Sequence, residues 1–262
     1  MAKIVEFIPN FSEGRRQEVI DAISDAACSV DGVKLINVNV EASYNRCVPT
    51  IVGNPEAVLE AGFRMCQKAV ELIDMRTHKG EHPRIGAIDA SPFIPIEEIT
   101  PEECVELCHR LGERIARELQ VPVYLYEKAA KRPERVKLQN IRHPEYEGLC
   151  ELINKPEWAP DYGEAKMHPT AGAMPLGVRS PMVAFNISLN TPDVTIAKKI
   201  AQSFREARGG YAEARAIGVY LEDRKICQVS CMISKNALMD CCEYYMQLEN
   251  FDRKAQILEE RL

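Results

Sequence analysis

The chain has 262 residues, of which 46% are hydrophobic and 27% charged, with a formal net charge of −6 and a pI near 5.6. A chain of this length can bury one large core or two smaller ones. Its lysines and arginines are scattered, so composition excludes the basic surface that a nucleic-acid-binding protein needs. Small anionic ligands remain compatible with local cations.

The cysteines and the apolar runs indicate the compartment. The start of the chain has no apolar segment typical of a signal peptide, and no apolar run is long enough to cross a bilayer. The ten cysteines form no Cys-x-x-Cys pair, and most fall within periodic apolar segments. We therefore expect them to be small core residues of a cytoplasmic protein.

Hydrophobic periodicity predicts alternating strands and helices in the first half. Asn54 followed by Pro55 marks one helix start, and Thr100-x-x-Glu103 has the form of a capping box. Pro49 indicates an edge strand or a bulge. We expect strands at residues 3–9, 33–40, 47–53 and 121–126 and from residue 85, and helices at residues 19–31, 55–74 and 101–118.

The order of these elements is strand, helix, strand, strand, helix, strand, which is typical of ferredoxin-like folds. After a helical piece near residues 146–153, the pattern starts again. A strand at 181–189, a helix from Thr191-Pro192 to residue 208, and strands at 215–221 and 225–233 are predicted. From residue 235 the chain is predicted to be helical, so the second half lacks a closing strand.

A long segment between the two halves has no clear period. Residues 156–178 are rich in proline and glycine and contain the only tryptophan, Trp158. Irregular segments of this length in compact domains are usually functional or disordered. We favour a functional loop, because its small residues would let a ligand lie close to backbone N–H groups.

The segment 78–84 carries the densest set of chemical groups in the chain. It contains two of the five histidines, two cations and a carboxylate just before an apolar run. His78, Glu81 and His82 match the His-x-x-Glu-His spacing of zinc peptidases, but that motif needs a helix, which Gly80 and Pro83 disfavour. A catalytic loop is the alternative to a surface loop in which His82 only caps the preceding helix.

The other histidines are less informative. His168 lies in the glycine-proline segment, where it can contact a ligand or be solvated. His109 and His143 have no partner in sequence. Asn45 and Arg46 can present an amide and a guanidinium group to a carboxylate, although a solvated turn remains an equal alternative.

The sequence resembles the formiminotransferase family, which includes stand-alone bacterial glutamate formiminotransferases and the first domain of formiminotransferase-cyclodeaminase. The similar segments follow the family's order along nearly the whole chain. They are residues 5–6, 9–14, 45–46, 73–75, 78–95, 121–126, 158–161, 168–173, 184–186 and 228–230.

The resemblance implies two ferredoxin-like α/β subdomains whose sheets face each other across a tunnel that holds folate. The N-terminal subdomain would span residues 1–178, with the linker and folate loop at 156–178, and the C-terminal subdomain residues 179–262. It also implies transfer of the formimino group from N-formimino-L-glutamate to N5 of tetrahydrofolate, without a metal or redox cofactor. A cytoplasmic homodimer is the expected assembly, with no nucleic-acid or membrane partner.

The resemblance also assigns site residues. The family's catalytic histidine corresponds to His82, with Asn39 and Glu41 as further catalytic candidates. Its folate loop corresponds to residues 163–172. The expected substrate and folate contacts are Asn45, Arg46, Lys79, Arg84, Gly163, His168, Pro169, Thr170, Ala171, Gly172 and Arg179.

Two departures from the family pattern affect these expectations. Asn37 and Asn39 stand where many members have aspartates, and Glu41 is a possible replacement. Near residue 234 the chain passes directly from a strand to the closing helix, which indicates that a helix and a strand have been omitted. A folate-binding relative without catalysis is therefore the alternative function, and a zinc peptidase using His78, Glu81 and His82 is a third.

Overall fold

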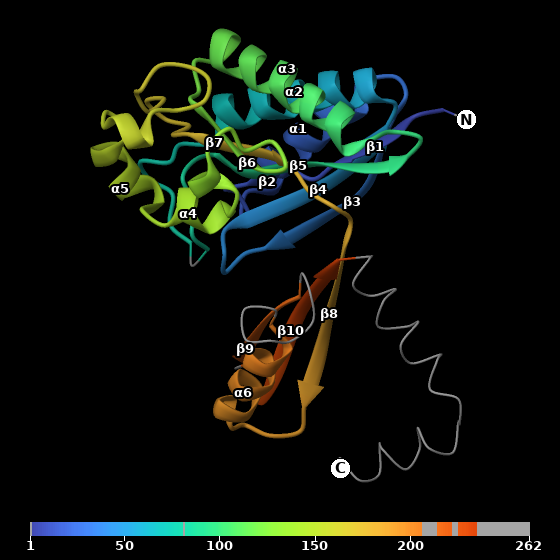
Figure 1. Cartoon of the computed structure of the whole chain (residues 1–262), viewed down its shortest axis with the longest axis vertical. Coiled ribbons are helices and arrows are strands. Elements are labelled where there is room, and N and C mark those ends of the chain that lie inside the picture. Colours follow the sequence, from blue (N-terminus) through green and yellow to red (C-terminus); the bar gives the residue numbers. More distant parts are fainter. Residues whose placement is uncertain (1, 81, 206–213, 222–224, 235–262) are drawn as a thin grey trace. The chain divides into compact units, whose positions relative to one another are not determined.

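The computed structural model describes residues 2–80, 82–205, 214–221 and 225–234. The chain forms two compact units, Met1–Arg179 and Ser180–Leu262 (Figure 1). Both contain helices and strands, which confirms the predicted α/β class. Among the described residues, no helix is both long and apolar enough to cross a membrane.

The first unit contains one sheet of seven strands. β3, β4, β1 and β5 lie in this order and are antiparallel, with helices joining β2 to β3 and β4 to β5, so they form the predicted ferredoxin-like motif. β7 extends the sheet parallel to β5, and β6 is parallel to β7. The strands are β1 (Ile4–Phe7), β2 (Asn10–Phe11), β3 (Val33–Glu41), β4 (Arg46–Gly53), β5 (Ile88–Glu97), β6 (Val123–Glu127) and β7 (Met174–Val178).

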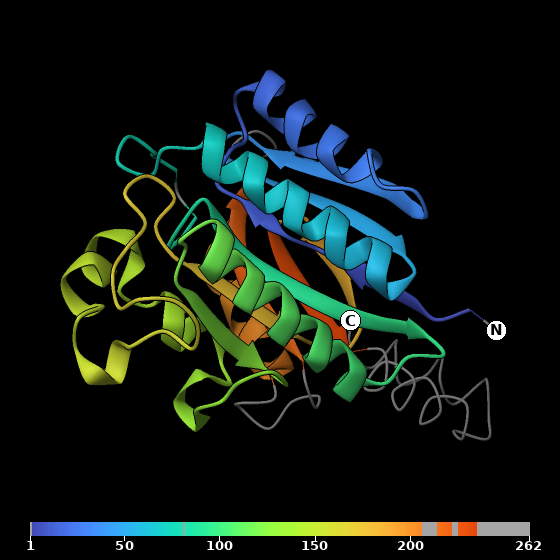
Figure 2. The same cartoon turned by 90° about the horizontal axis from the view of Figure 1, so that it is seen from above.

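Three long helices cover one face of this sheet, α1 (Gln17–Cys28), α2 (Pro55–Leu72) and α3 (Pro101–Glu118) (Figure 2). The predicted caps are confirmed: the Asn54 side chain accepts from the Ala57 N–H, and Thr100 and Glu103 form a capping box. The helices α4 (Leu138–Arg142) and α5 (Glu145–Leu152) follow β6. The sequence indicated α5 but not α4.

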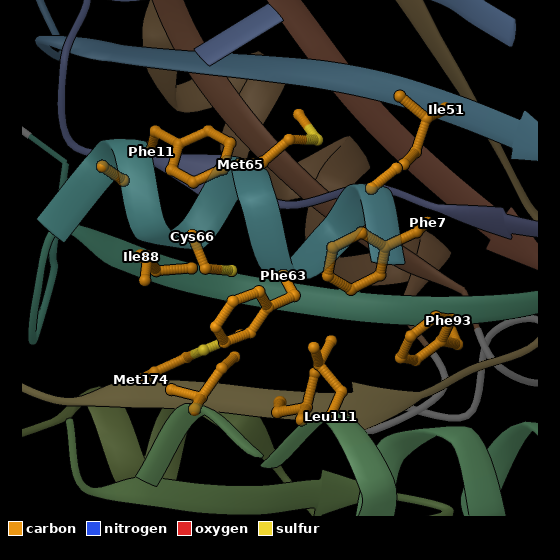
Figure 3. Packing of buried hydrophobic residues seen from close by; sticks show 14 of the residues in the cluster. Phe7, Phe11, Ile51, Phe63, Met65, Cys66, Ile88, Phe93, Leu111 and Met174 are labelled. Atoms are coloured by element: carbon orange, nitrogen blue, oxygen red, sulfur yellow. The ribbon is translucent and has the colours of Figure 1, made fainter. Parts of the chain in front are cut away.

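The core of the first unit lies between the helices and the sheet (Figure 3). The rings of Phe7 on β1 and Phe93 on β5 are 4.5 Å apart, and both side chains are fully buried. Phe63 of α2 and Leu111 of α3 pack in the same cluster. Burying each such side chain contributes roughly 1.5–3 kcal/mol, so this core fixes the sheet that carries the site.

Three predictions for the first unit need correction. The strand expected from residue 85 begins at Ile88. The segment 156–178, expected to be irregular, contains the buried strand β7, whose apolar run was hidden by Pro175 and Gly177. β4 is not an edge strand, because it pairs with β3 on one side and with β1 and β2 on the other. The alternative, a bulge, occurs in the partner strand β3 between Leu35 and Asn37, opposite Ile51 and Thr50, whereas Pro49 pairs with Val38.

Six of the eight described cysteines are buried, which confirms their predicted role as small core residues. Cys28 and Cys150 are the exceptions and are exposed. Cys241 and Cys242 lie outside the described residues.

The second unit has the first part of the same motif. α6 (Val194–Phe204) joins β8 (Met182–Leu189) to β9 (Arg215–Leu221), and β10 (Ile226–Ser234) lies between these two strands, antiparallel to both. The helix begins with Asp193 as its cap, not at Thr191 as predicted. Within the described part of the chain, β8 pairs with β10 only. The helix expected from residue 235 lies outside that part.

The helix side of this small sheet is covered unevenly. α6 packs on β9 and β10, and Ala197, Ala201 and Val229 are buried there. On β8, Val183 and Ile187 share this face through their register with Ile233 and Val229, yet they are 40% and 45% exposed. The described residues therefore leave an apolar strip along β8.

We expect the substitutions Ile187→Ala and Ile233→Ala to have different effects. Both residues lie on the same face, but Ile233 is 2% exposed and Ile187 45%. Truncation of Ile233 should cost about 2–5 kcal/mol, and truncation of Ile187 under about 1 kcal/mol, because little buried contact is lost. Hydrogen exchange of β10 amides in the native protein measures both values. Equal costs would show that another part of the chain covers Ile187 in solution.

Candidate active site

The polar candidates lie on the face of the first sheet that is opposite the three long helices. Side chains alternate along a strand, and Cys47 of β4 points into the helix-covered core. Arg46 therefore points to the opposite face, together with its register partner Glu41. Asn39 and Asn37 follow on β3 at alternate positions. The sheet thus brings the predicted residues 37, 39, 41 and 46 to one face.

The histidine segment is tied to this face by Asn45. The Asn45 side chain accepts a hydrogen bond from the Gly14 N–H at 2.9 Å and donates one to the Lys79 carbonyl at 3.0 Å. Its own carbonyl lies 3.0 Å from Nε2 of His78. Asn45 has a φ of 50°, a left-handed conformation that asparagine tolerates better than most residues. Its amide is engaged within the chain, and the ligand contact expected from the sequence stays a prediction.

His82 is the centre of a cluster that no short sequence motif defines. Nη1 of Arg46 lies 2.7 Å from Nε2 of His82, and Oδ2 of Asp89 lies 3.8 Å from Nδ1. The Tyr44 ring is 5.8 Å from the imidazole, measured between centroids. A guanidinium group can only donate, so Nε2 accepts from Arg46, and Nδ1 carries the proton of the neutral ring.

Asp89 anchors this cluster from β5. It is 1% exposed, and its carboxylate accepts hydrogen bonds from the Ile85 N–H at 3.1 Å and from Nη2 of Arg142 at 2.7 Å. Burial raises the pKa of Asp89, whereas Arg142, the Ile85 amide and Arg46 oppose this shift. The buried carboxylate therefore holds Arg142 of α4 beside the histidine segment.

The cluster strongly disfavours a charged imidazole. Burial, and next the positive charges of Arg46 and Arg142, lower the pKa of His82 to about 3. The ring is therefore neutral at physiological pH in this arrangement. Among the described residues, Nε of Arg46 and Nε of Arg142 are buried without a hydrogen-bond partner. Two under-bonded guanidinium groups are suited to an anionic ligand.

His78 has a different environment from His82. Its Nε2 faces the Asn45 carbonyl, and its Nδ1 lies 3.4 Å from Nε of Arg84, so both ring nitrogens have partners in the chain. Burial, with a smaller effect of Arg84, lowers the pKa of His78. The described residues 78–80 and 82–87 form no helix, and Glu81 lies outside the described residues. This arrangement does not fit the zinc-peptidase motif.

The other predicted cations are distributed around the site. Arg84 is buried and binds Glu145 and Glu147 with its two terminal nitrogens, at distances of 2.7–3.0 Å. Lys79 is exposed. Arg179 is close enough to Glu6 of β1 to lower the pKa of that carboxyl, although burial raises it overall. The structure therefore brings Arg46 to His82 and uses Arg84 in an ion-pair cluster.

The predicted folate loop packs against the residues on either side of the histidine segment. Nδ1 of His168 accepts from the Ala171 N–H at 2.9 Å, which closes a tight turn that includes Pro169. The Thr170 carbonyl accepts from the Met75 N–H, and the Ala171 carbonyl from the Ala87 N–H.

Glycines allow this close approach. A Cβ on Gly86 would lie 2.1 Å from the Ala173 carbonyl oxygen, and one on Gly172, where φ is 74°, would lie 2.6 Å from that of Ile85. Gly163 also has a positive φ, of 88°, and packs beside Pro122. The small residues of this loop thus have a packing role, and the expected folate contact stays a prediction.

The residues that replace the family's aspartates bond to their own neighbours. Nδ2 of Asn37 donates to Oδ1 of Asn39 at 3.0 Å. Glu41, the suggested replacement carboxylate, accepts from the Ser43 hydroxyl at 2.7 Å in the hairpin turn. Among the described residues, the carboxylate that forms an ion-pair contact with His82 is Asp89 instead.

Sequence reasoning missed Asp89 and Arg142 as site residues. Asp89 had a usable signal, because it interrupts an apolar run, and a carboxylate in a buried strand needs a partner. Arg142 had no such signal, because it follows several other arginines in a polar region. Its role depends on tertiary structure, which brings Arg142 at the end of α4 to Asp89 of β5.

The substitution Asn45→Ala should loosen the histidine segment. It removes both side-chain hydrogen bonds, leaves the Gly14 N–H unpaired, and places alanine at a positive φ. We expect a loss of about 3 kcal/mol in the free energy of unfolding, measured with urea. The control is Asn140→Ala, which removes one exposed hydrogen bond to Glu134 and should change stability by under about 1 kcal/mol. Similar losses of stability in both variants would contradict the role of Asn45 in holding the histidine segment.

Comparison with known proteins identifies the family. The model of the formiminotransferase domain, N-terminal subdomain, matches residues 4–179. Glutamate formimidoyltransferase of Streptococcus pyogenes serotype M1 is 46% identical over 297 residues, covering 100% of this chain and 99% of that protein. The enzyme of the same name from Thermoplasma acidophilum is 36% identical over 296 residues, covering 99% and 97%.

A longer relative gives the same assignment. Formimidoyltransferase-cyclodeaminase of Rattus norvegicus is 45% identical over 236 residues, covering 88% of this chain and 43% of that protein. The Streptococcus alignment extends over 297 residues and this chain has 262, so at least 35 positions of that alignment have no counterpart here. On these similarities and the matched N-terminal subdomain, the chain belongs to the formiminotransferase family.

Proposed function

We propose that this chain transfers the formimino group from N-formimino-L-glutamate to N5 of tetrahydrofolate, its co-substrate. The observation that supports this most strongly is the cluster around His82, in which an imidazole lies between a guanidinium group and a buried carboxylate. The names of the similar enzymes agree with this reaction. No metal or redox chemistry is required for it.

The chemistry needs one group that can take up and return a proton. N5 attacks the amidine carbon of the donor, and a tetrahedral adduct forms. The N5 proton must leave, and the glutamate nitrogen must gain a proton before its bond to carbon breaks. A single imidazole can accept the first proton and supply the second, so no net proton is lost.

The cluster gives each residue a role in this proposal. Nε2 of His82 is the proton acceptor, because Nδ1 carries the proton of the neutral ring and points toward Asp89. Asp89 orients the ring and stabilises its charged form during the reaction. Arg46 and Arg142 attract a substrate carboxylate. Asn39 and Glu41 line the same face of the sheet.

The proposed folate contacts are supported by where the residues lie and by the chemistry of their side chains. In the turn that contains His168, the Ala171 carbonyl accepts from the N–H of Ala87, which follows the histidine segment, so the turn can guide the pterin toward His82. Lys79 is available for a carboxylate of the folate tail. Gly163 and Arg179 are further expected folate or substrate contacts. Asn45 and Arg84 would act by supporting the histidine segment.

A folate-binding protein without catalysis is the second candidate. Asn37 and Asn39 supply no carboxylate, and at least 35 positions of a full-length relative have no counterpart in this chain. This shortfall supports the proposal that the second subdomain, residues 179–262, is incomplete near residue 234. Residue 235 itself lies outside the described residues. Tight tetrahydrofolate binding without turnover of any formimino or formyl donor would favour this candidate.

We further propose a cytoplasmic homodimer. Buried thiols support a reducing compartment. The dimer depends on the resemblance to the family. Sedimentation of the purified protein measures the assembly directly.

The proposed reaction is tested by following 5-formimino-tetrahydrofolate formation from N-formimino-L-glutamate with purified full-length protein. We expect turnover that depends on both substrates and is unaffected by a metal chelator. Background rates with folded protein that binds tetrahydrofolate would contradict catalysis and leave the binding function.

The substitution His82→Ala tests the proton carrier. We expect kcat to fall about 10²–10⁴-fold while the dissociation constant for tetrahydrofolate changes little, because the ring acts mainly on proton transfer. His143→Ala is the control, since His143 is exposed at the end of α4. Equal losses in kcat and folate affinity would show that His82 mainly binds.

A further inference from the structure

The contact between Arg46 and His82 conflicts with a simple catalytic base. Nη1 of Arg46 is 2.7 Å from Nε2 of His82 and donates to it, so the lone pair of Nε2 is already engaged. The same lone pair cannot accept the N5 proton of tetrahydrofolate. For the proposed reaction to proceed, Arg46 must leave Nε2.

Arg46 has few other contacts that hold it in this position. Its other hydrogen bond, to Oδ1 of Asn10, is 3.4 Å long, and its guanidinium carbon lies 5.6 Å from the centre of the Tyr44 ring. Its Nε is buried without a partner among the described residues. Asp89 attracts its charge, and Arg142 opposes this attraction with a smaller repulsion. A carboxylate that bound Arg46 with two oxygens would make stronger, charge-assisted hydrogen bonds than a neutral imidazole does.

We propose that Arg46 is a latch on His82, which a carboxylate of the formimino donor releases by drawing the guanidinium group away from Nε2. This inference rests on the proposed function and adds a step of activation to it. The donor is the relevant source of the carboxylate, because its α-carboxylate is bonded to the carbon next to the reacting amidine nitrogen. The carboxylates of the folate tail are separated from N5 by the aminobenzoyl group.

The electrostatics of the cluster give this step a direction. Among the residues that the structure describes, the charged and titratable groups that face His82 are Tyr44, Arg46, Asp89 and Arg142. Burial and the two arginines lower the pKa of the imidazole. A bound carboxylate would supply the second negative charge, which together with Asp89 balances the two arginines, and the loss of the Arg46 hydrogen bond would restore the lone pair. Both changes raise the pKa of His82 toward neutrality, where an imidazole exchanges protons efficiently.

The latch also predicts a form of specificity. A donor that lacks the carboxylate can occupy the site but leaves Arg46 on Nε2, so its defect should appear in kcat as well as in KM. If the carboxylate only bound the donor, and did so equally in the ground state and the transition state, its loss would raise KM alone.

The direct test is an NMR titration of the histidine ring signals, with His82 assigned by loss of its signal in His82→Ala. The chain has five histidines, so the spectrum is simple. In full-length protein alone, we expect the pKa of His82 to lie well below the ordinary value of a histidine. Saturating L-glutamate, the reaction product, should raise it by about one unit or more, and the corresponding diamide should not. Tetrahydropteroate, which has no glutamate tail, should leave it unchanged.

Variants of Arg46 identify the group that responds. In Arg46→Ala, the pKa of His82 should be higher without ligand and should no longer respond to L-glutamate. Arg46→Lys keeps the charge but loses the guanidinium fork, so the response should be reduced. Arg110→Ala, which removes an exposed ion pair with Glu56, is the control and should behave as the unmodified chain does.

Two results would overturn the latch: an unchanged pKa of His82 with L-glutamate bound at saturation, or no binding of L-glutamate by folded protein. Failure of the proposed function gives a different result. If the pKa of His82 responds to L-glutamate but no formimino transfer is detected with both substrates present, the latch stands and the catalytic proposal fails. If transfer is normal but the pKa does not respond, the proposed function stands and the latch fails.

Discussion

The burial of Asp89 in β5 is the constraint on which the site depends. A carboxylate that is 1% exposed destabilises the fold unless charged or hydrogen-bonding partners surround it. Arg142 and the Ile85 N–H supply them, and this couples α4 to the start of β5. The histidine segment is held between these elements and the hydrogen bonds of Asn45. His82 is therefore fixed by contacts whose main energetic role is to compensate one buried charge.

The same charges explain why the site can be both stable and reactive. Two guanidinium groups near one carboxylate leave a positive excess beside a neutral imidazole. Such a site attracts carboxylates, and both proposed substrates carry them. A substrate carboxylate would complete the charge balance. In the proposed mechanism, binding thus supplies the electrostatic change that the proton carrier needs.

The sequence predicted local structure well where the signal was local. Asn54 and Thr100 marked helix starts that the structure confirms, and the repeated strand pattern predicted the ferredoxin-like arrangement of the first unit. It failed for β7, because a strand buried on both faces shows no alternation and Pro175 hid it. The histidine segment was found from composition, but its partners Asp89 and Arg142 come together only through tertiary packing. The incompleteness of the second unit inferred from the sequence stays a prediction, because the chain after residue 234 lies outside the described residues.

The position of N5 in a complex with tetrahydrofolate and L-glutamate tests the central claim most directly. A crystal structure of that complex should place N5 within about 2.6–3.2 Å of Nε2 of His82, with the Arg46 guanidinium on a glutamate carboxylate. A complex in which N5 lies far from His82, while Arg46 keeps its contact with Nε2, would contradict the account.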